Sequence, residues 1–230
     1  MVQDSIETLL SAILADDVAQ AGRLLEADGG LALQPVEAAR LYRSGIFHWL
    51  YAGDTALHLA AAGYREKIAR ALLAAGADPN AAANHRHSRP LHYAADSYLG
   101  GPDWDPERQV QTIRTLLKAG ADLQAHDRNG ATALHRAVRT RCAAAVVCLL
   151  EAGADPAGRN LSGSTPFHLA VQNTGRGGSG TEIAIRAQRQ IIQEFLARGV
   201  SPQLKDGKGK SVTECATSLW VRKLLSEPAA

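Results

Sequence analysis

The hydrophobic and polar positions of this chain form a pattern of two apolar stretches that recurs four times. The first stretch begins with Thr or Arg, continues through Leu or Phe to a His, and ends in small apolar residues, as in GDTALHLAAAG at residues 53–63. The second carries paired apolar residues and ends in a glycine, as in LLAAGADPN at residues 72–80. Apolar residues spaced by three and four predict amphipathic helices, and Thr and Gly are typical of helix starts and ends. Each copy therefore predicts a pair of helices.

The two stretches keep a fixed phase along the chain. Successive histidines of the first stretch are 34, 43 and 33 residues apart, and successive glycines of the second are 44, 33 and 46 apart. The histidines are His58, His92, His135 and His168, and the glycines are Gly76, Gly120, Gly153 and Gly199. A base period near 33 with longer members predicts an array of helical repeats.

These repeated residues resemble the ankyrin repeat, and the resemblance covers roughly residues 51–225. Thr165-Pro166-Phe167-His168 stands where the family has Thr-Pro-Leu-His, and Ala152-Gly153-Ala154-Asp155 stands at its Gly-Ala-Asp. Arg89 replaces the Thr in the second copy, and Ala replaces the Pro in the first and third. The resemblance implies an all-α solenoid of six stacked helix pairs, consisting of four full repeats and two degenerate caps.

A single domain over residues 1–230 is expected. Residues 1–50 are predicted to hold an N-terminal cap and an extra, partly helical segment at 33–50. Residues 51–204 hold the four repeats, and residues 205–230 form the C-terminal cap, because the outer faces of such an array need covering.

Composition supports thin, closely packed helices and a cytoplasmic location. Hydrophobic residues make up 46% of the chain but aromatic residues only 5%, so Ala and Leu must fill the core. The N-terminal stretch has no basic residue before its apolar part and does not look like a secretory signal. Three cysteines are too few for a disulfide framework, and no apolar run approaches the roughly 20 residues of a membrane span. The combination RTRC with TGRGGSG resembles a pattern of bacterial ankyrin repeat proteins.

The charge is uneven along the chain and predicts an acidic or anionic partner. Residues 1–50 have a net charge of −4, residues 51–125 are neutral, and residues 126–230 have a net charge of +6. Ankyrin repeat proteins usually contact partners through the loops between repeats and the exposed face of the first helices, so the resemblance implies a protein-binding scaffold that uses its concave face. The predicted partner-binding residues are His85, Arg86, Arg128, Asn129, Arg136, Arg139, Arg159, Ser162, Gln172, Lys205, Lys208 and Lys210.

A second candidate site lies at the links between the two helices of a pair. The links at 96–105 and 173–181 are long and flank a short Arg-rich link at 139–142, and insertions on one face often mark a binding face. Glycine backbone and guanidinium groups suit an anionic group, which makes a small-anion sensor the alternative function. The candidate residues of this edge pocket are Trp104, Arg139, Arg141, Arg176, Gly177 and Gly178.

Purely structural interpretations of these links are the alternatives to a binding site. Asp105-Pro106-Glu107 also matches an ordinary helix start. Thr181 matches the cap of the helix that follows a flexible link. Arginine clusters are commonly solvated or paired with acids.

Neither catalysis nor a metal or cofactor is predicted. The four repeat histidines are expected to satisfy local backbone and Thr groups. His85 and His87 lack a third ligand, and Cys142 and Cys148 fall on different helix faces. No nucleophile has a recognisable base. Nucleic acid is disfavoured as a partner because the chain's net charge is only +2 and no aromatic residues interleave the basic ones.

Overall fold

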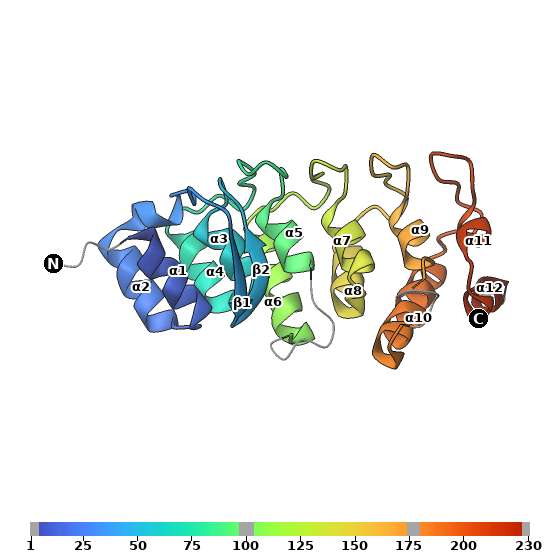
Figure 1. Ribbon diagram of the computed structural model, residues 1–230, viewed down its shortest axis with the longest axis horizontal. Helices are drawn as coiled ribbons and strands as arrows, with labels where there is room; N and C mark the ends of the chain where they lie inside the picture. The colour runs from blue at the N-terminus through green and yellow to red at the C-terminus, as the bar shows by residue number, and fades with distance from the viewer. Residues whose placement is uncertain (1–4, 97–103, 174–179, 227–230) are drawn as a thin grey trace.

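The computed structural model describes residues 5–96, 104–173 and 180–226. Within them, twelve α-helices stand in consecutive pairs along one elongated array, with the first pair at one end and the last at the other (Figure 1). The first helices of the pairs are α1 (Ile6–Leu14), α3 (Ala56–Ala62), α5 (Pro90–Ala95), α7 (Ala133–Arg139), α9 (Pro166–Ala170) and α11 (Val212–Cys215). The second helices are α2 (Val18–Ala27), α4 (Glu66–Ala74), α6 (Pro106–Lys118), α8 (Ala143–Glu151), α10 (Glu182–Ala197) and α12 (Leu219–Ser226).

First and second helices form two rows, and the loops from one pair to the next project beyond them along the upper edge of Figure 1. These loops are called fingers below and comprise residues 77–89, 121–132, 154–165 and 200–211. The predicted helix-hairpin solenoid is therefore confirmed. A short 3-10 helix, η1 (Gly29–Ala32), and a two-stranded sheet are added to it, so the chain is mostly helical and not all-α.

Each repeat histidine closes the start of its own helix and binds the next finger. In the third repeat, the backbone N–H of Thr132 donates to His135 Nδ1 at 3.2 Å, and His135 Nε2 lies 3.2 Å from the carbonyl oxygen of Ser164. This pattern requires a neutral ring with its proton on Nε2. Burial favours that state, because it lowers the pKa of His135. In the second repeat, burial lowers the pKa of His92 to about 4. The structural role predicted for these histidines is confirmed.

The predicted helix boundaries also hold. The four glycines that follow the second helices all have positive φ, between 75° at Gly199 and 96° at Gly76, a conformation that glycine adopts without steric cost. Asp105 Oδ1 accepts the N–H groups of Glu107 and Arg108, so the ordinary helix start is the correct interpretation of that segment.

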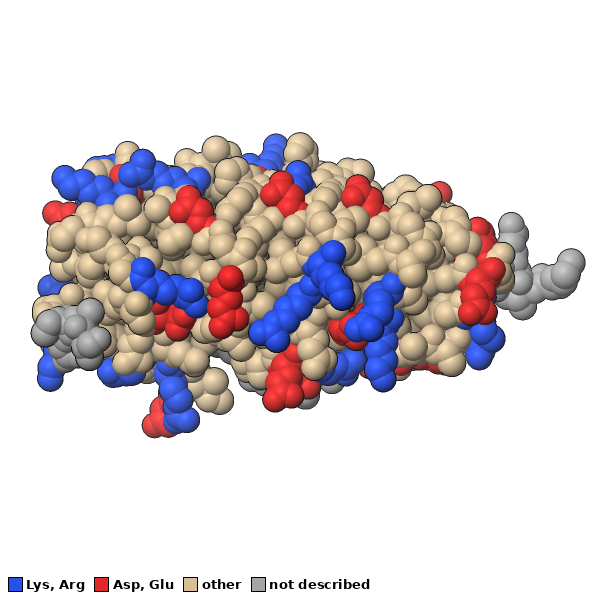
Figure 2. Space-filling view, turned by 180° about the vertical axis from the view of Figure 1, so that it is seen from behind, with Lys and Arg blue, Asp and Glu red and all other residues tan. Residues whose placement is uncertain are grey.

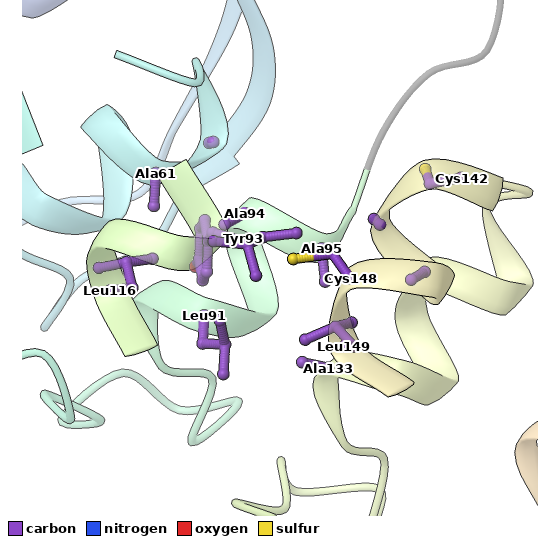
Figure 3. Packing of buried hydrophobic residues seen from close by; sticks show 14 of the residues in the cluster. Ala61, Leu91, Tyr93, Ala94, Ala95, Leu116, Ala133, Cys142, Cys148 and Leu149 are labelled. Carbon is purple, nitrogen blue, oxygen red and sulfur yellow. The ribbon is translucent and has the colours of Figure 1, made fainter. Parts of the chain in front are cut away.

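Small side chains let the helices approach, and larger ones fill the space between the pairs (Figure 3). Ala94, Ala95 and Ala133 are buried beside Leu91 and the fully buried Leu149. The low aromatic content of the chain fits this arrangement, because two rows of thin helices leave little room for rings. Cys142 and Cys148 lie apart on α8 and its start, as predicted.

Residues 40–50 form a β-hairpin where the sequence analysis expects a partly helical segment; that prediction is wrong. Strand β1 (Arg40–Ser44) pairs antiparallel with β2 (Ile46–Leu50) around Gly45, whose φ is +72°. Aromatic and β-branched residues favour a pleated strand, and here they are concentrated in a few positions. Ile46 and Leu50 are buried, and Ile46 packs against Gly63 at the end of α3, where a Cβ would collide with it.

A buried arginine fixes the hairpin to the array. Arg65 donates to the carbonyl oxygen of Gly45 at 2.8 Å and to that of Ile13 at 3.3 Å. Arg40 and Glu7 add a more exposed ion pair between β1 and α1, which lowers the pKa of Glu7. The hairpin is thus held to the row of first helices, in front of α3 in Figure 1.

Among the helices that the structure describes, none is both long enough and apolar enough to cross a bilayer.

Amide side chains join neighbouring fingers at their bases, except at one junction. Asn80 donates to the carbonyl oxygen of Gly120 at 2.9 Å and accepts the N–H of Asp122 at 2.8 Å. Gln124 bridges the next finger in the same way, to the carbonyl oxygen of Gly153 and the N–H of Asp155. The corresponding position at the following junction is Ala157.

Ala157 cannot make this bridge, because its side chain is a methyl group. Its own turn is the same, since its N–H donates to the Asp155 carboxylate at 2.8 Å just as the N–H of Asn80 donates to Asp78. A surface pocket of about 510 Å³ lies between Ala157 and residues 198–204. The junction between the third and fourth repeats therefore lacks a link that the two preceding junctions have.

Leu149→Ala should destabilise the protein by about 2–5 kcal/mol, because it leaves a cavity in the buried face of α8 between two neighbouring pairs. Leu161→Ala is the matched control, since this leucine is 80% exposed and its truncation should change stability by less than about 0.5 kcal/mol. Chemical denaturation measures both. Equal stability of the two variants would contradict the packing of α8.

Ala157→Asn should stabilise the protein by about 0.5–1.5 kcal/mol, because the local turn already matches that of Asn80 and the amide would find a carbonyl and an N–H to bridge. Asn80→Ala should cost a similar amount. The same denaturation experiment compares them. A destabilised Asn80→Ala beside an unchanged Ala157→Asn would show that the third junction does not accept an amide.

Candidate functional site

A groove opens between the hairpin, the first finger and the ends of α5 and α7. Its volume is about 410 Å³. The residues that line it come from segments far apart in the sequence: Leu41, Phe47, His48, Trp49, Tyr51, Arg86, Tyr93, Asp96, Arg136 and Arg139. Apolar rings and charged groups thus meet in one concavity, a combination typical of binding sites.

Exposed aromatic side chains form the hairpin side of the groove. Phe47 is 60% exposed and Trp49 is 46% exposed. Trp49 stacks on Tyr51 with ring centroids 6.0 Å apart, and the edge of His85 meets the Tyr51 ring at 4.9 Å. Arg86 lies over the same Tyr51 ring at 5.3 Å and donates to its hydroxyl at 3.0 Å. The hairpin and the first finger therefore share one continuous aromatic rim.

The floor of the groove is a buried Tyr93 that neighbouring polar groups hold in place. Its hydroxyl donates to Asp54 Oδ2 at 2.6 Å, and its ring contacts the rings of His48 and His58 at centroid distances of 4.7 and 5.0 Å. Burial and the Asp54 carboxylate raise the pKa of Tyr93 well above its ordinary value. Tyr93 is thus a fixed neutral hydrogen-bond donor, and its rigid ring supports the groove.

A buried ion-pair network lies beside this floor. Arg136 is only 4% exposed and binds Asp96 at 2.8 Å, Asp127 at 2.7 Å and the Ser88 hydroxyl at 2.6 Å. Burial would raise the pKa of Asp96, but the neighbouring His48 and Arg136 outweigh it and lower the pKa. The two carboxylates in turn keep the pKa of Arg136 raised against its own burial. The network therefore remains ionised and ties α7 to the first and second fingers.

Arg139 is the exposed cation of the groove. Its side chain is 58% exposed, and its guanidinium lies 3.5 Å from Asp96 Oδ1. Because Asp96 is already bound to Arg136, Arg139 keeps much of its donor capacity for a ligand.

The structure places most predicted partner-binding residues at the surface. His85, Arg128, Asn129, Arg139, Arg159, Ser162, Gln172, Lys205, Lys208 and Lys210 are exposed, and Arg86 is half-buried. The exposed position predicted for Arg136 is wrong. Its helix face would be open in a bare array, but the buried carboxylates of Asp96 and Asp127 draw it inward.

Arg141 does not take the place predicted for it in the edge pocket. It is 8% exposed, and its guanidinium donates to the carbonyl oxygens of Leu169, Ala170 and Gln172. Helix C-termini leave such carbonyl groups without partners and carry a partial negative charge, so a cation is stabilised there. The predicted availability of Arg141 for an anion is therefore wrong.

Of the remaining edge-pocket residues, Trp104 and Arg139 lie in the part of the chain that the structure describes. Trp104 is half-buried and donates to Gln109 Oε1 at 3.2 Å, while Arg139 faces Asp96 and the groove. Arg176, Gly177 and Gly178 lie outside the described residues.

The aromatic rim was missed by the sequence analysis, although a signal for it exists. Four of the chain's eleven Phe, Trp and Tyr residues fall within residues 42–51. In a chain that builds its core from Ala and Leu, such a concentration outside the repeats indicates a separate purpose.

One cluster resembles a metal site by composition. His168, Asp206 and Cys215 place ligand atoms within 4.8 Å of one another. However, His168 Nδ1 contacts the Thr165 hydroxyl at 2.8 Å and Nε2 the carbonyl oxygen of Lys210 at 3.1 Å. Both ring nitrogens thus serve the repeat, as in the other three copies.

Models of the ankyrin repeat match residues 52–84 and, as three consecutive copies, residues 105–206. Together these ranges cover more than half of the chain. The chain belongs to the ankyrin repeat family. No match was found among curated proteins.

Ankyrin repeats are generally protein–protein interaction modules, and this chain adds the hairpin and its groove to that scaffold. The first finger beyond residue 84, α5 and the long link after it fall between the two matched ranges, and the hairpin precedes them. On the face opposite to that of Figure 1, basic and acidic side chains are interspersed (Figure 2). Most residues that line the groove, including its aromatic rim, therefore lie outside the matched ranges.

Asp96→Asn should destabilise the protein at pH 7 by about 1.5–3 kcal/mol, the range for a hydrogen bond to a charged group, because Arg136 keeps only Asp127 as a buried counter-ion. The folded pKa of Asp96 lies below its unfolded value, so the carboxylate stabilises the fold above about pH 4 and less as the pH falls through the folded pKa.

The difference between wild type and Asp96→Asn should therefore shrink between pH 5 and strongly acidic pH, as measured by urea denaturation across that range. Glu151→Gln is the control, because this carboxylate is more than half exposed and 3.8 Å from Arg114. A constant difference at every pH would refute the proposed ionisation of Asp96.

Proposed function

We propose that this ankyrin repeat protein is a non-catalytic interaction module that binds an acidic protein partner through its fingers and the adjoining groove. The observation that supports this most directly is a row of fingers that are bonded to one another and carry exposed cations. A protein surface with acidic side chains would complement such a row.

Backbone hydrogen bonds hold the fingers in register. The N–H of Arg128 donates to the carbonyl oxygen of Arg86 at 2.8 Å, and the N–H of Leu161 to that of Asn129 at 2.9 Å. The N–H of Gly207 donates to Gly163 at 2.8 Å, where the two glycines approach too closely for a Cβ. The fingers therefore form one edge and not four independent loops.

Basic side chains dominate this edge. Each finger carries at least one: Arg86, Arg128, Arg159, and then Lys205, Lys208 and Lys210 together on the last finger. The acidic residues among them have local roles. Asp127 pairs with Arg136 and Asp122 with Arg89. The carboxylates of Asp78, Asp155 and Asp206 accept backbone N–H groups within their own turns. The edge therefore presents more positive than negative charge to a partner.

A small-anion sensor at the helix links is the weaker proposal. Arg141 is bound to helix carbonyl groups, and Arg139 faces the groove instead of that edge. Both observations favour a protein partner over a small ligand held by the links.

Charge reversal of the fingers should weaken partner binding. The Arg128→Glu, Arg159→Glu, Lys208→Glu triple variant changes three exposed fingers, and the Arg23→Glu, Lys67→Glu, Arg114→Glu triple variant changes three exposed residues of second helices by the same charge. Partners captured from lysate would be identified, purified and titrated against both variants and wild type at low and high salt.

The finger variant loses three surface ion pairs with the partner, so its binding should be roughly 10- to 100-fold weaker. The control variant should bind with an affinity near that of the wild type. Wild-type affinity should fall as salt rises, because the pairs are exposed. Equal affinity of both triple variants would disprove the role of the fingers.

A further inference from the structure

The groove combines positive charge with exposed aromatic rings and a fixed floor, which a merely basic surface does not. Its rim exposes two large rings, its wall carries guanidinium groups, and its floor is fixed by buried hydrogen bonds. The proposal below rests on the proposed function and specifies what part of the partner enters this groove.

The rim offers rings for stacking. Phe47 and Trp49 are on β2, and Tyr51 continues the rim toward the first finger. Aromatic pairs attract one another beyond the area they bury, in offset or edge-on geometries. The Tyr51 contacts with Trp49 and His85 show both kinds of geometry within the rim itself, at 6.0 and 4.9 Å. A further ring from a partner would extend this stack.

The wall offers an excess of positive charge. Three guanidinium groups line the groove, from Arg86, Arg136 and Arg139, against the single carboxylate of Asp96. Asp127 lies beneath and neutralises one of them through Arg136. One unit of positive charge therefore remains, and the exposed Arg139 is the group able to turn it toward a ligand. A carboxylate matches the planar fork of guanidinium donors.

The size of the groove limits what can occupy it. A volume of about 410 Å³ is at the small end of ligand pockets and suits one aromatic side chain with its immediate neighbour. A helix about 10 Å wide would rest on the rim and not enter. The Tyr93–Asp54 bond and the Arg136 network fix the floor before binding, which lowers the entropy cost of recognition.

We infer that the groove binds an acidic peptide segment of the partner, in which an aromatic side chain stacks against Trp49 and Phe47 while an adjacent carboxylate pairs with Arg139. Arg86, stacked on Tyr51, closes the rim on the finger side and connects the groove with the basic edge. Specificity then comes from the groove, and the fingers add charge attraction.

Three blocked pentapeptides test this inference with the full-length protein: acetyl-Gly-Asp-Phe-Asp-Gly-amide, the same peptide with Asn in place of both Asp residues, and the same peptide with Ala in place of Phe. Isothermal titration and the NMR signal of the Trp49 indole N–H report binding. The acidic aromatic peptide should bind at least about tenfold more tightly than either of the others, since each lacks one of the two contacts.

Variants of the protein test which residues make the two contacts with the peptide. Trp49→Ala should weaken the acidic aromatic peptide, and Arg139→Gln should bring its affinity down to that of the Asn peptide. Arg114→Gln, an exposed arginine of α6 away from the groove, should leave all three affinities unchanged. Three equal affinities, no binding by any peptide, or an undiminished preference in Arg139→Gln would overturn the inference.

The failure of this inference is distinguishable from failure of the proposed function. If the finger variant loses its captured partner while Trp49→Ala keeps it, the fingers bind the partner and the groove does not. If Trp49→Ala and Arg139→Gln abolish the peptide preference while the finger variant binds its partner normally, the groove is the site and the charged edge is not.

Discussion

The contact that an imidazole makes between each helix pair and the following finger is the one on which the rest of the structure depends. His58, His92, His135 and His168 each reach the carbonyl group immediately before the next first helix, at Ser88, Ala131, Ser164 and Lys210. One ring thus sets where a helix begins and where the next finger leaves the array. The spacing of the exposed cations on the fingers follows from that contact, so the core determines the geometry of the basic edge.

The hairpin adds a groove to this regular array. It lies over the first-helix row and places the aromatic residues of β2 opposite α5 and α7. Arg136 has a different role here from the one expected of a surface arginine. In a bare array it would be one more surface cation, but here it is the buried partner of Asp96 and Asp127, and Arg139 one turn later is left as the exposed charge. One short helix therefore supplies both the buried arginine that holds the groove and the exposed arginine that we propose contacts the partner.

Much of the fold could be predicted from the sequence because the repeat contacts are local. The helix starts at Thr132 and Asp105, the positive φ of Gly76, and the buried position of Leu149 depend on residues a few positions away. The hairpin could not be predicted in this way. Its strands are stabilised by Arg65 and by packing on α3, which lie outside the segment itself.

The two misplaced arginines illustrate the same limit in the site. Arg136 and Arg141 are basic residues at positions that face outward in the repeat pattern. The pattern does not show which hydrogen-bond acceptors lie near them. Asp96 and Asp127 draw Arg136 inward, while the orphan carbonyl groups at the end of α9 draw Arg141. Asp127 is only nine residues from Arg136, but Asp96 and the α9 carbonyl groups belong to neighbouring repeats, so the sequence of one repeat could not reveal them.

The missing amide bridge at Ala157 affects how the array behaves under load. In a linear array each repeat is coupled only to its neighbours, so a force along the long axis passes through every junction in series. The two preceding junctions carry an amide bridge between finger bases, whereas this one lacks it and has a side-chain link only farther out, where Arg159 donates to the carbonyl oxygen of Lys205 at 2.8 Å. We expect the fourth repeat and the C-terminal pair to separate first when the ends are pulled apart, while the groove, which lies wholly on the N-terminal side of that junction, stays assembled. A partner bound there could therefore remain attached to a partly extended protein.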